Sequence, residues 1–137
     1  MSAALRWTSY GVFSLLWVSG CLWLILHERF PSQTPFGPLP NLWEAPLIHL
    51  HGWLAVAGVF VLGWICGGHV LDRWPLYRVR ASGPFLAGLA ALLVATGYAL
   101  YYTTDRVHQI ASTTHRILGA AGILLAILHW TGNSRRR

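Results

Sequence analysis

The side chains most able to do chemistry in this 137-residue chain are its seven histidines, four of which form two spaced pairs. His51 and His69 are 18 residues apart, which is five turns of an α-helix, so their rings would share a face about 27 Å apart. His115 and His129 are 14 residues apart, close to four turns, and would share a face about 21 Å apart. Imidazole is a common iron ligand, and rings on two facing helices can bind one iron from both sides. The spacing therefore predicts two bis-histidine sites, each suited to a haem.

The choice of ligands leaves alternatives open. His49 lies 20 residues before His69 and falls on nearly the opposite helix face, so His51 is preferred and His49 is the alternative. His108 is a further candidate beside a predicted loop. The two spacings differ by about 6 Å of helical rise, which tilt, imidazole reach or a break near Gly67–Gly68 would absorb. A histidine at a membrane helix end can also be an interfacial residue whose ring nitrogens contact water.

The elements that would position these rings are four apolar runs. The chain is 55% hydrophobic and only 10% charged, far below the charge of an ordinary soluble domain. Its mean hydropathy is +0.49. Each run is long enough to cross a bilayer, and the four runs cover residues 8–26, 47–69, 83–102 and 110–130. The sequence therefore predicts an all-α fold, a four-helix transmembrane bundle that forms a single domain over residues 1–137.

The ten arginines predict the orientation of this bundle. With the N-terminus inside, seven arginines are cytoplasmic and three, Arg29, Arg106 and Arg116, are outside, which satisfies the positive-inside rule with both termini cytoplasmic. His51 and His115 then lie toward the outer surface, and His69 and His129 toward the inner one. The net charge of +6 does not indicate nucleic-acid binding, because the arginines are scattered at the ends of apolar runs.

Two further compositional features bear on the site. Five prolines in residues 31–46 predict an extended surface loop and not a helix, and residues 103–109 are predicted to be a short loop. The second and fourth runs contain several glycines. A flat macrocycle bound between helices needs positions without side chains, although small residues also let membrane helices pack closely. These glycines are Gly52, Gly58, Gly63, Gly67, Gly68, Gly119 and Gly122.

Two stretches resemble the haem-binding helices of a known group. "HRILGAAGILLAILHW" and "HLHGWLAVAGVFVLGWICGGH" are similar to helices of bacterial four-helix di-haem b-type cytochromes. This superfamily includes the cytochrome b subunits of formate dehydrogenases and nickel–iron hydrogenases, and the bacterial cytochrome b-561 type. The resemblance covers about half of the chain, namely the helices that carry the paired histidines.

The resemblance implies two haem b groups in the bacterial inner membrane that carry electrons between a quinone and a partner redox protein. Partners of this kind are another redox subunit or a periplasmic cytochrome, and the chain would act as the electron-transfer part of a quinone-linked oxidoreductase. Arg116 beside His115, and Arg73 near His69, could pair with haem propionates; the alternative is that both are interfacial cations whose side chains reach the membrane surface. Several relatives have a haem ligand near the inner end of the first helix, where this chain has no histidine. The inner haem must therefore use His69 or be absent.

A quinone site needs a polar, titratable group near one haem, because quinone redox chemistry moves protons. The candidates are His27, Glu28 and His108 outside and Asp72 inside. Two other functions stay open at this point: a mono-haem subunit of a larger complex, and a non-redox membrane anchor with interfacial histidines.

Overall fold

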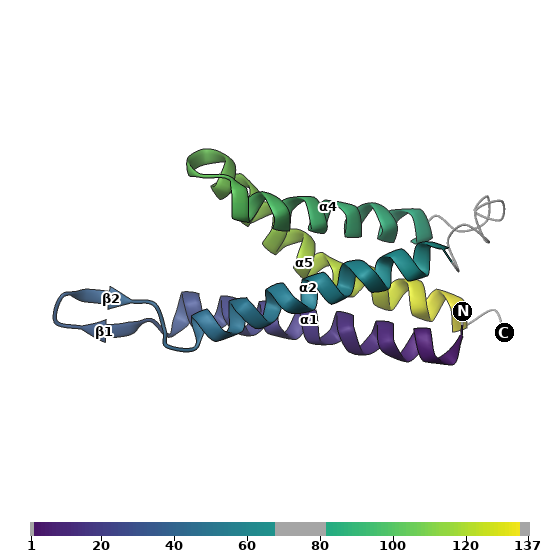
Figure 1. Cartoon of the computed structure of the whole chain (residues 1–137), viewed down its shortest axis with the longest axis horizontal. Coiled ribbons are helices and arrows are strands. Elements are labelled where there is room, and N and C mark those ends of the chain that lie inside the picture. Colours follow the sequence, from purple (N-terminus) through teal and green to yellow (C-terminus); the bar gives the residue numbers. More distant parts are fainter. Residues whose placement is uncertain (1, 68–81, 135–137) are drawn as a thin grey trace. The chain divides into compact units, whose positions relative to one another are not determined.

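The computed structural model describes the backbone of residues 2–67 and 82–134 and the side chains up to residue 128, apart from residues 82 and 84. Contacts divide the chain into two compact units, Met1–Leu71 and Asp72–Arg137. Each unit contains two neighbouring helices that pack against each other, and we call these units the first and second helical hairpins. The elements in chain order are α1 (Ala3–Arg29), β1 (Ser32–Thr34), β2 (Gly37–Leu39), α2 (Glu44–Ile65), α4 (Ser82–Tyr102) and α5 (Asp105–Ser134) (Figure 1).

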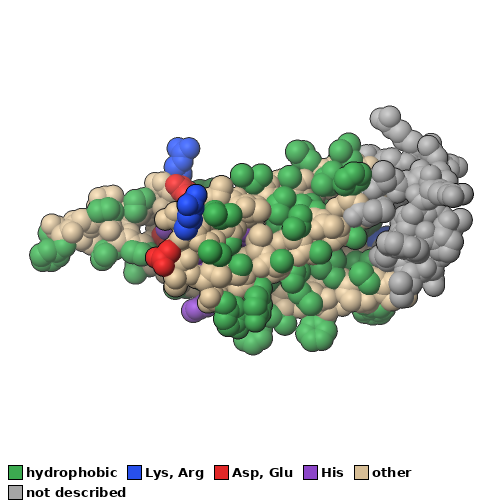
Figure 2. All heavy atoms as spheres, turned by 90° about the horizontal axis from the view of Figure 1, so that it is seen from above, with side chains coloured by type: hydrophobic (Ala, Val, Ile, Leu, Met, Phe, Trp, Pro, Cys, Tyr) green, Lys and Arg blue, Asp and Glu red, His purple; other side chains and the backbone are tan. Residues whose placement is uncertain are grey.

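The described helices have the surface of membrane spans. Four of them are long and apolar enough to cross a bilayer, and only 6–11% of the residues in their most hydrophobic windows are buried. Trp53 and Phe60, for example, are each 76% exposed, and hydrophobic side chains spread along the helices in the view of Figure 2. Apolar surface on this scale requires a lipid environment. The prediction of a multi-pass, mostly helical membrane protein is confirmed.

Three helix boundaries differ from the prediction. α1 begins at Ala3 because Ser2 caps it, its Oγ accepting a hydrogen bond from the Leu5 N–H at 3.2 Å. α2 begins at Glu44, so Pro46 lies in its first turn. Proline lacks a backbone N–H, and an N–H in the first turn would have no partner within the helix. α5 begins at Asp105 and not near residue 110, so the predicted loop over residues 103–109 is wrong. Only Thr103 and Thr104 separate α4 from α5, and Asp105 makes the turn with a positive φ of 54°.

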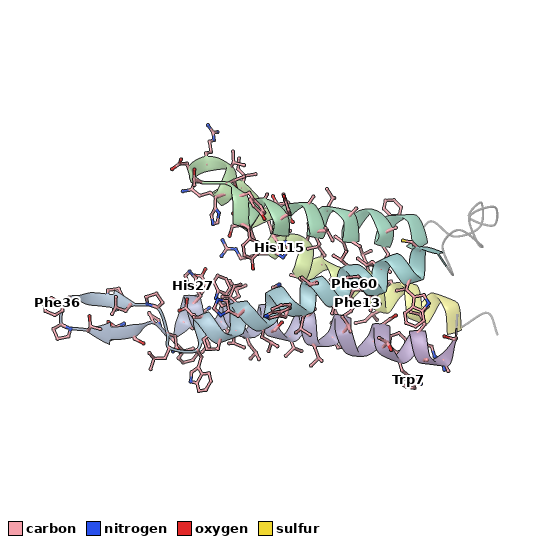
Figure 3. The ribbon with its side chains drawn as sticks, viewed as in Figure 1. Trp7, Phe13, His27, Phe36, Phe60 and His115 are labelled. Carbon is pink, nitrogen blue, oxygen red and sulfur yellow. The ribbon has the colours of Figure 1, made fainter. Side chains whose placement is uncertain are left out.

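The proline-rich segment between α1 and α2 is extended, as predicted, but it also pairs with itself. β1 and β2 form an antiparallel β-ribbon in which Ser32 lies opposite Leu39. At its tip Thr34 Oγ1 donates to the carbonyl of Gly37 at 2.6 Å, and Gly37 has a φ of +113° that favours glycine. Phe36 occupies the tip and is fully exposed (Figure 3). The pairing gives backbone groups partners in a segment where proline prevents a helix.

The glycines of the second and fourth predicted runs divide into two groups. A Cβ at Gly58 would contact Phe13 and Leu16 of α1, and a Cβ at Gly122 would contact Leu89 of α4, at 3.5–3.6 Å. These two glycines lie where helices pack within a hairpin. In contrast, a Cβ at Gly63, Gly67 or Gly119 would meet nothing within 4 Å. Those positions leave open space on the helix surface.

Candidate functional site

His51 is held against α1 by a hydroxyl and a backbone carbonyl. Its Nδ1 lies 3.1 Å from Ser19 Oγ and 3.1 Å from the carbonyl oxygen of Leu16. Ser19 is buried, and its hydroxyl donates to the same Leu16 carbonyl at 2.9 Å. The ring packs on Gly20, where a Cβ would approach His51 Cε1 to 2.9 Å, too close for any side chain without a shift. Ser19 and Gly20 therefore fix both the orientation and the position of this imidazole.

His115 is held in the same way against α4, in the second helical hairpin (Figure 3). Its Nδ1 lies 2.9 Å from Thr96 Oγ1. The hydroxyl of Thr96 also lies 2.7 Å from the carbonyl oxygen of Leu92. Gly97 makes room for the ring, because a Cβ there would lie 3.3 Å from His115 Cε1. In both hairpins, the first helix thus contacts the histidine of the second helix through a hydroxyl residue and the glycine that follows it.

The hydrogen-bond partners assign the same tautomer to both rings. A carbonyl oxygen only accepts, so each hydroxyl donates its one hydrogen to Leu16 or Leu92. With the hydroxyl hydrogen on these carbonyls, the hydroxyl oxygen accepts from Nδ1 of His51 and of His115, and the Leu16 carbonyl, 3.1 Å from His51 Nδ1, can accept from the same ring hydrogen. Nε2 of a neutral ring is therefore the nitrogen with a lone pair. Metal-binding histidines are characteristically oriented in this manner, with the second nitrogen donating to a protein acceptor.

These contacts reveal a repeat that our reading of the sequence missed. Ser19-Gly20 in α1 corresponds to Thr96-Gly97 in α4. In the second helix of each hairpin the histidine is followed seven residues later by a packing glycine, as in His51…Gly58 and His115…Gly122. The signal was available as two Ser/Thr-Gly pairs on the first helices and two His-x₆-Gly motifs on the second. It shows that the two hairpins are built alike around one histidine each.

Both histidines lie within their helices and not at the ends where they were predicted. His51 is seven residues after the start of α2, about 11 Å along its axis. His115 is ten residues after the start of α5, about 15 Å along its axis, because α5 begins earlier than predicted. Each ring is partly buried in its hairpin. Each imidazole therefore lies against the first helix of its own hairpin, and the first turn of α5 contains the charged residues Asp105 and Arg106.

The other candidates differ in their surroundings. His49 is exposed on α2, which favours His51 as the ligand of the two. His108 is exposed in the first turn of α5 and does not lie in a loop. Arg116 is exposed beside His115. His69 and Arg73 lie outside the described residues, and His129 belongs to α5 but its side chain is not described. Among the side chains that the structure describes, no three or more histidine, cysteine or carboxylate groups gather as a metal cage would require.

A separate polar cluster lies at the end of the first helical hairpin next to the β-ribbon. His27, in the last turn of α1, places its Nδ1 2.9 Å from Glu44 Oε2 at the start of α2. The other oxygen of this carboxylate accepts the Asn41 N–H at 2.7 Å. The His27 ring stacks on Trp23 with 4.9 Å between ring centroids and an 11° angle between planes. Trp7 lies at the opposite end of α1 (Figure 3).

No protein-family model, curated protein or solved structure matches this chain. The geometry of the two histidine sites and of the His27 cluster is therefore the basis for the function proposed below.

Proposed function

We propose that the protein is an integral membrane b-type cytochrome that passes electrons across the membrane between two haems, linking a quinone pool to a partner redox protein. The observation that carries this proposal is the pair of imidazoles in matching settings. His51 and His115 each donate from Nδ1 to a hydroxyl of the preceding helix and each pack on a glycine. With the hydrogen on Nδ1, Nε2 of each ring carries the lone pair that a haem iron would require of a histidine ligand.

We propose that His51 and His115 would together hold one haem in the outer half of the membrane. This pairing rests on helix phase and topology, since α2 and α5 run in the same direction when the N-terminus is inside. Gly119, one turn after His115, has open space where a side chain would stand. A bound haem would supply one-electron chemistry at its iron. We propose His69 and His129 as ligands of a second, inner haem, and Arg116 and Arg73 as partners of the propionates.

The proposed setting is the cytoplasmic membrane of a bacterium, with both termini cytoplasmic. The excess of arginine on the inner side supports this orientation. It places the β-ribbon, Glu44 and His27 on the outer side. A redox partner on that side, such as a periplasmic cytochrome or another subunit, could exchange electrons with the outer haem.

The direct test is a reduced-minus-oxidised visible spectrum of the purified protein together with its haem-to-protein ratio. We expect b-type absorbance and a ratio of about two, because four imidazoles make two bis-histidine sites. A ratio near one would replace this function with that of a mono-haem subunit. A protein purified with no haem, and unable to bind added haemin, would contradict the cytochrome and favour a non-redox anchor.

The two hydroxyls provide a prediction of their own. Thr96→Val removes the hydroxyl acceptor of His115 Nδ1–H, and Ser19→Ala removes one of the two acceptors of His51 Nδ1–H, so each imidazole becomes a weaker electron donor. We expect a higher midpoint potential for the outer haem in a potentiometric titration, and about tenfold faster loss of haem to apomyoglobin. Thr103→Val and Ser9→Ala are matched controls, since both hydroxyls bond a backbone carbonyl in the same way. Unchanged potential and haem retention in both test variants would show that the hydroxyls do not act on a haem ligand.

A further inference from the structure

The polar cluster around His27 is separate from the histidines proposed as haem ligands. Glu44 is one of the buried polar residues among those described, and its side chain is only 10% exposed. Both carboxylate oxygens have partners, the Asn41 N–H and His27 Nδ1. Asn41 is itself fixed, because its side-chain amide donates to the Phe30 carbonyl at 2.8 Å and its side-chain oxygen accepts the Trp43 N–H at 3.0 Å. The base of the β-ribbon therefore holds the carboxylate in a defined place.

The carboxylate in turn orients the imidazole. An ionised carboxylate only accepts, so the hydrogen between His27 and Glu44 belongs to Nδ1 of the ring. Nε2 of the neutral ring then carries a lone pair and can accept a hydrogen bond from a ligand. The His27 side chain is 49% exposed while that of Glu44 is 10% exposed, so the imidazole is the accessible member of the pair. A buried carboxylate that orients an accessible imidazole is an arrangement suited to binding a hydroxyl group.

The surroundings indicate which hydroxyl compound would reach this nitrogen. His27 lies at the end of an apolar membrane span, and its ring stacks with Trp23 of the same helix. Glu28 and Arg29 follow His27 directly, and residues 30–43 contain no charged side chain. A ligand that reaches His27 from the lipid would be apolar, and a flat ring with a hydroxyl would match the Trp23 ring and the imidazole nitrogen. Of the other outer candidates, Glu28 and His108 are both exposed.

We propose that His27, oriented by Glu44, binds the headgroup hydroxyl of a lipid-soluble quinol through Nε2, with the Trp23 ring beside it. This inference deepens the proposed function, because it assigns its quinol to particular residues at the outer end of the first helical hairpin. His51 lies seven residues, about 11 Å, further along α2 from Glu44. The quinol headgroup is thus bound within one to two helical turns of the proposed outer haem ligand.

The test measures binding of decyl-substituted benzoquinol to the full-length protein in phosphatidylcholine nanodiscs, with empty discs as the blank for partitioning into lipid. We expect His27→Ala and Glu44→Gln to weaken binding about tenfold, the usual effect of losing one hydrogen bond to a charged or oriented partner. His27→Phe keeps a flat ring against Trp23 and removes both nitrogens, so it should weaken binding equally if the protein folds normally. His108→Ala and Glu28→Gln are the controls and should bind as the unchanged protein does.

The outcome can be separated from haem, because the same titration can be made on protein that carries both His51→Ala and His69→Ala and is expected to hold no haem. Binding that is unaffected by His27→Phe, or that weakens equally in His108→Ala, would overturn the assignment to His27. Absence of binding by the unchanged protein above the empty discs would overturn it as well. Loss of haem from the purified protein with quinol binding intact would contradict the proposed cytochrome and leave the His27 site standing.

Discussion

Replacing His115 by alanine is expected to abolish the outer haem and to lower the haem-to-protein ratio from about two to about one. The variant removes the Nε2 ligand that Thr96 orients, and the other histidine of the described part of α5, His108, lies seven residues, about 11 Å, away along the helix. His51→Ala should have the same effect, because both rings are proposed to bind the same iron. The measurement is the pyridine haemochrome content per protein, with the visible spectrum of the haem that remains.

Double variants test the pairing of these ligands. If His51 and His115 belong to one site, the variant that lacks both should still retain about one haem per protein, because both substitutions remove ligands of the same haem. Combining His51→Ala with His69→Ala should instead leave about none. His49→Ala and His108→Ala are the controls and should retain both haems. A His51/His115 double variant without haem, or a His49→Ala variant that loses one, would show that the ligands are paired differently.

Filling the space at Gly20 is expected to be nearly as damaging as losing His51. A Cβ at this position would lie 2.9 Å from His51 Cε1 and 3.2 Å from its Nδ1. The ring cannot move away without breaking its bonds to Ser19 and Leu16, so Gly20→Val should displace the ligand nitrogen and remove most of the outer haem. Gly97→Val should act in the same direction with a smaller loss, because the corresponding distance to His115 is 3.3 Å.

Gly11 provides the matched control on α1, since a Cβ there meets nothing within 4 Å. Gly11→Val should retain both haems, and Gly11→Ala should stabilise the helix by about 0.5–1 kcal/mol through the reduced entropy of the unfolded chain. Haem content after purification and the temperature of haem release measure these effects. Full haem retention by Gly20→Val would contradict the account of how His51 is positioned.

The membrane fold could be predicted from hydropathy alone, but the site only in part. Four long apolar runs allow little else than four spans, and the third was predicted to within one residue of α4. The ends of α1 and α5 were missed because their terminal turns are polar and depend on local devices, the Ser2 cap and the turn at Asp105. Helix phase selected His51 and His115 as candidate ligands, and each is held by a hydroxyl of the first helix of its hairpin.

What helix phase could not supply is the register between neighbouring helices. The contacts of His51 with Ser19 and of His115 with Thr96 join residues 32 and 19 positions apart, and they depend on how far each helix slides along its partner. Hydropathy contains no information on that displacement. The His27–Glu44 pair was missed for a similar reason, since Glu44 was placed in a loop and is in fact the first residue of α2.

The division of the chain into two helical hairpins has a consequence for how the protein is made. Each hairpin contains its own histidine–hydroxyl contact, so the first can close in the membrane while the second is still being synthesised. A cofactor that takes one ligand from each hairpin can be bound only after both have been inserted. In the proposed cytochrome, haem would then be acquired last, so that a truncated or half-inserted chain would lack it.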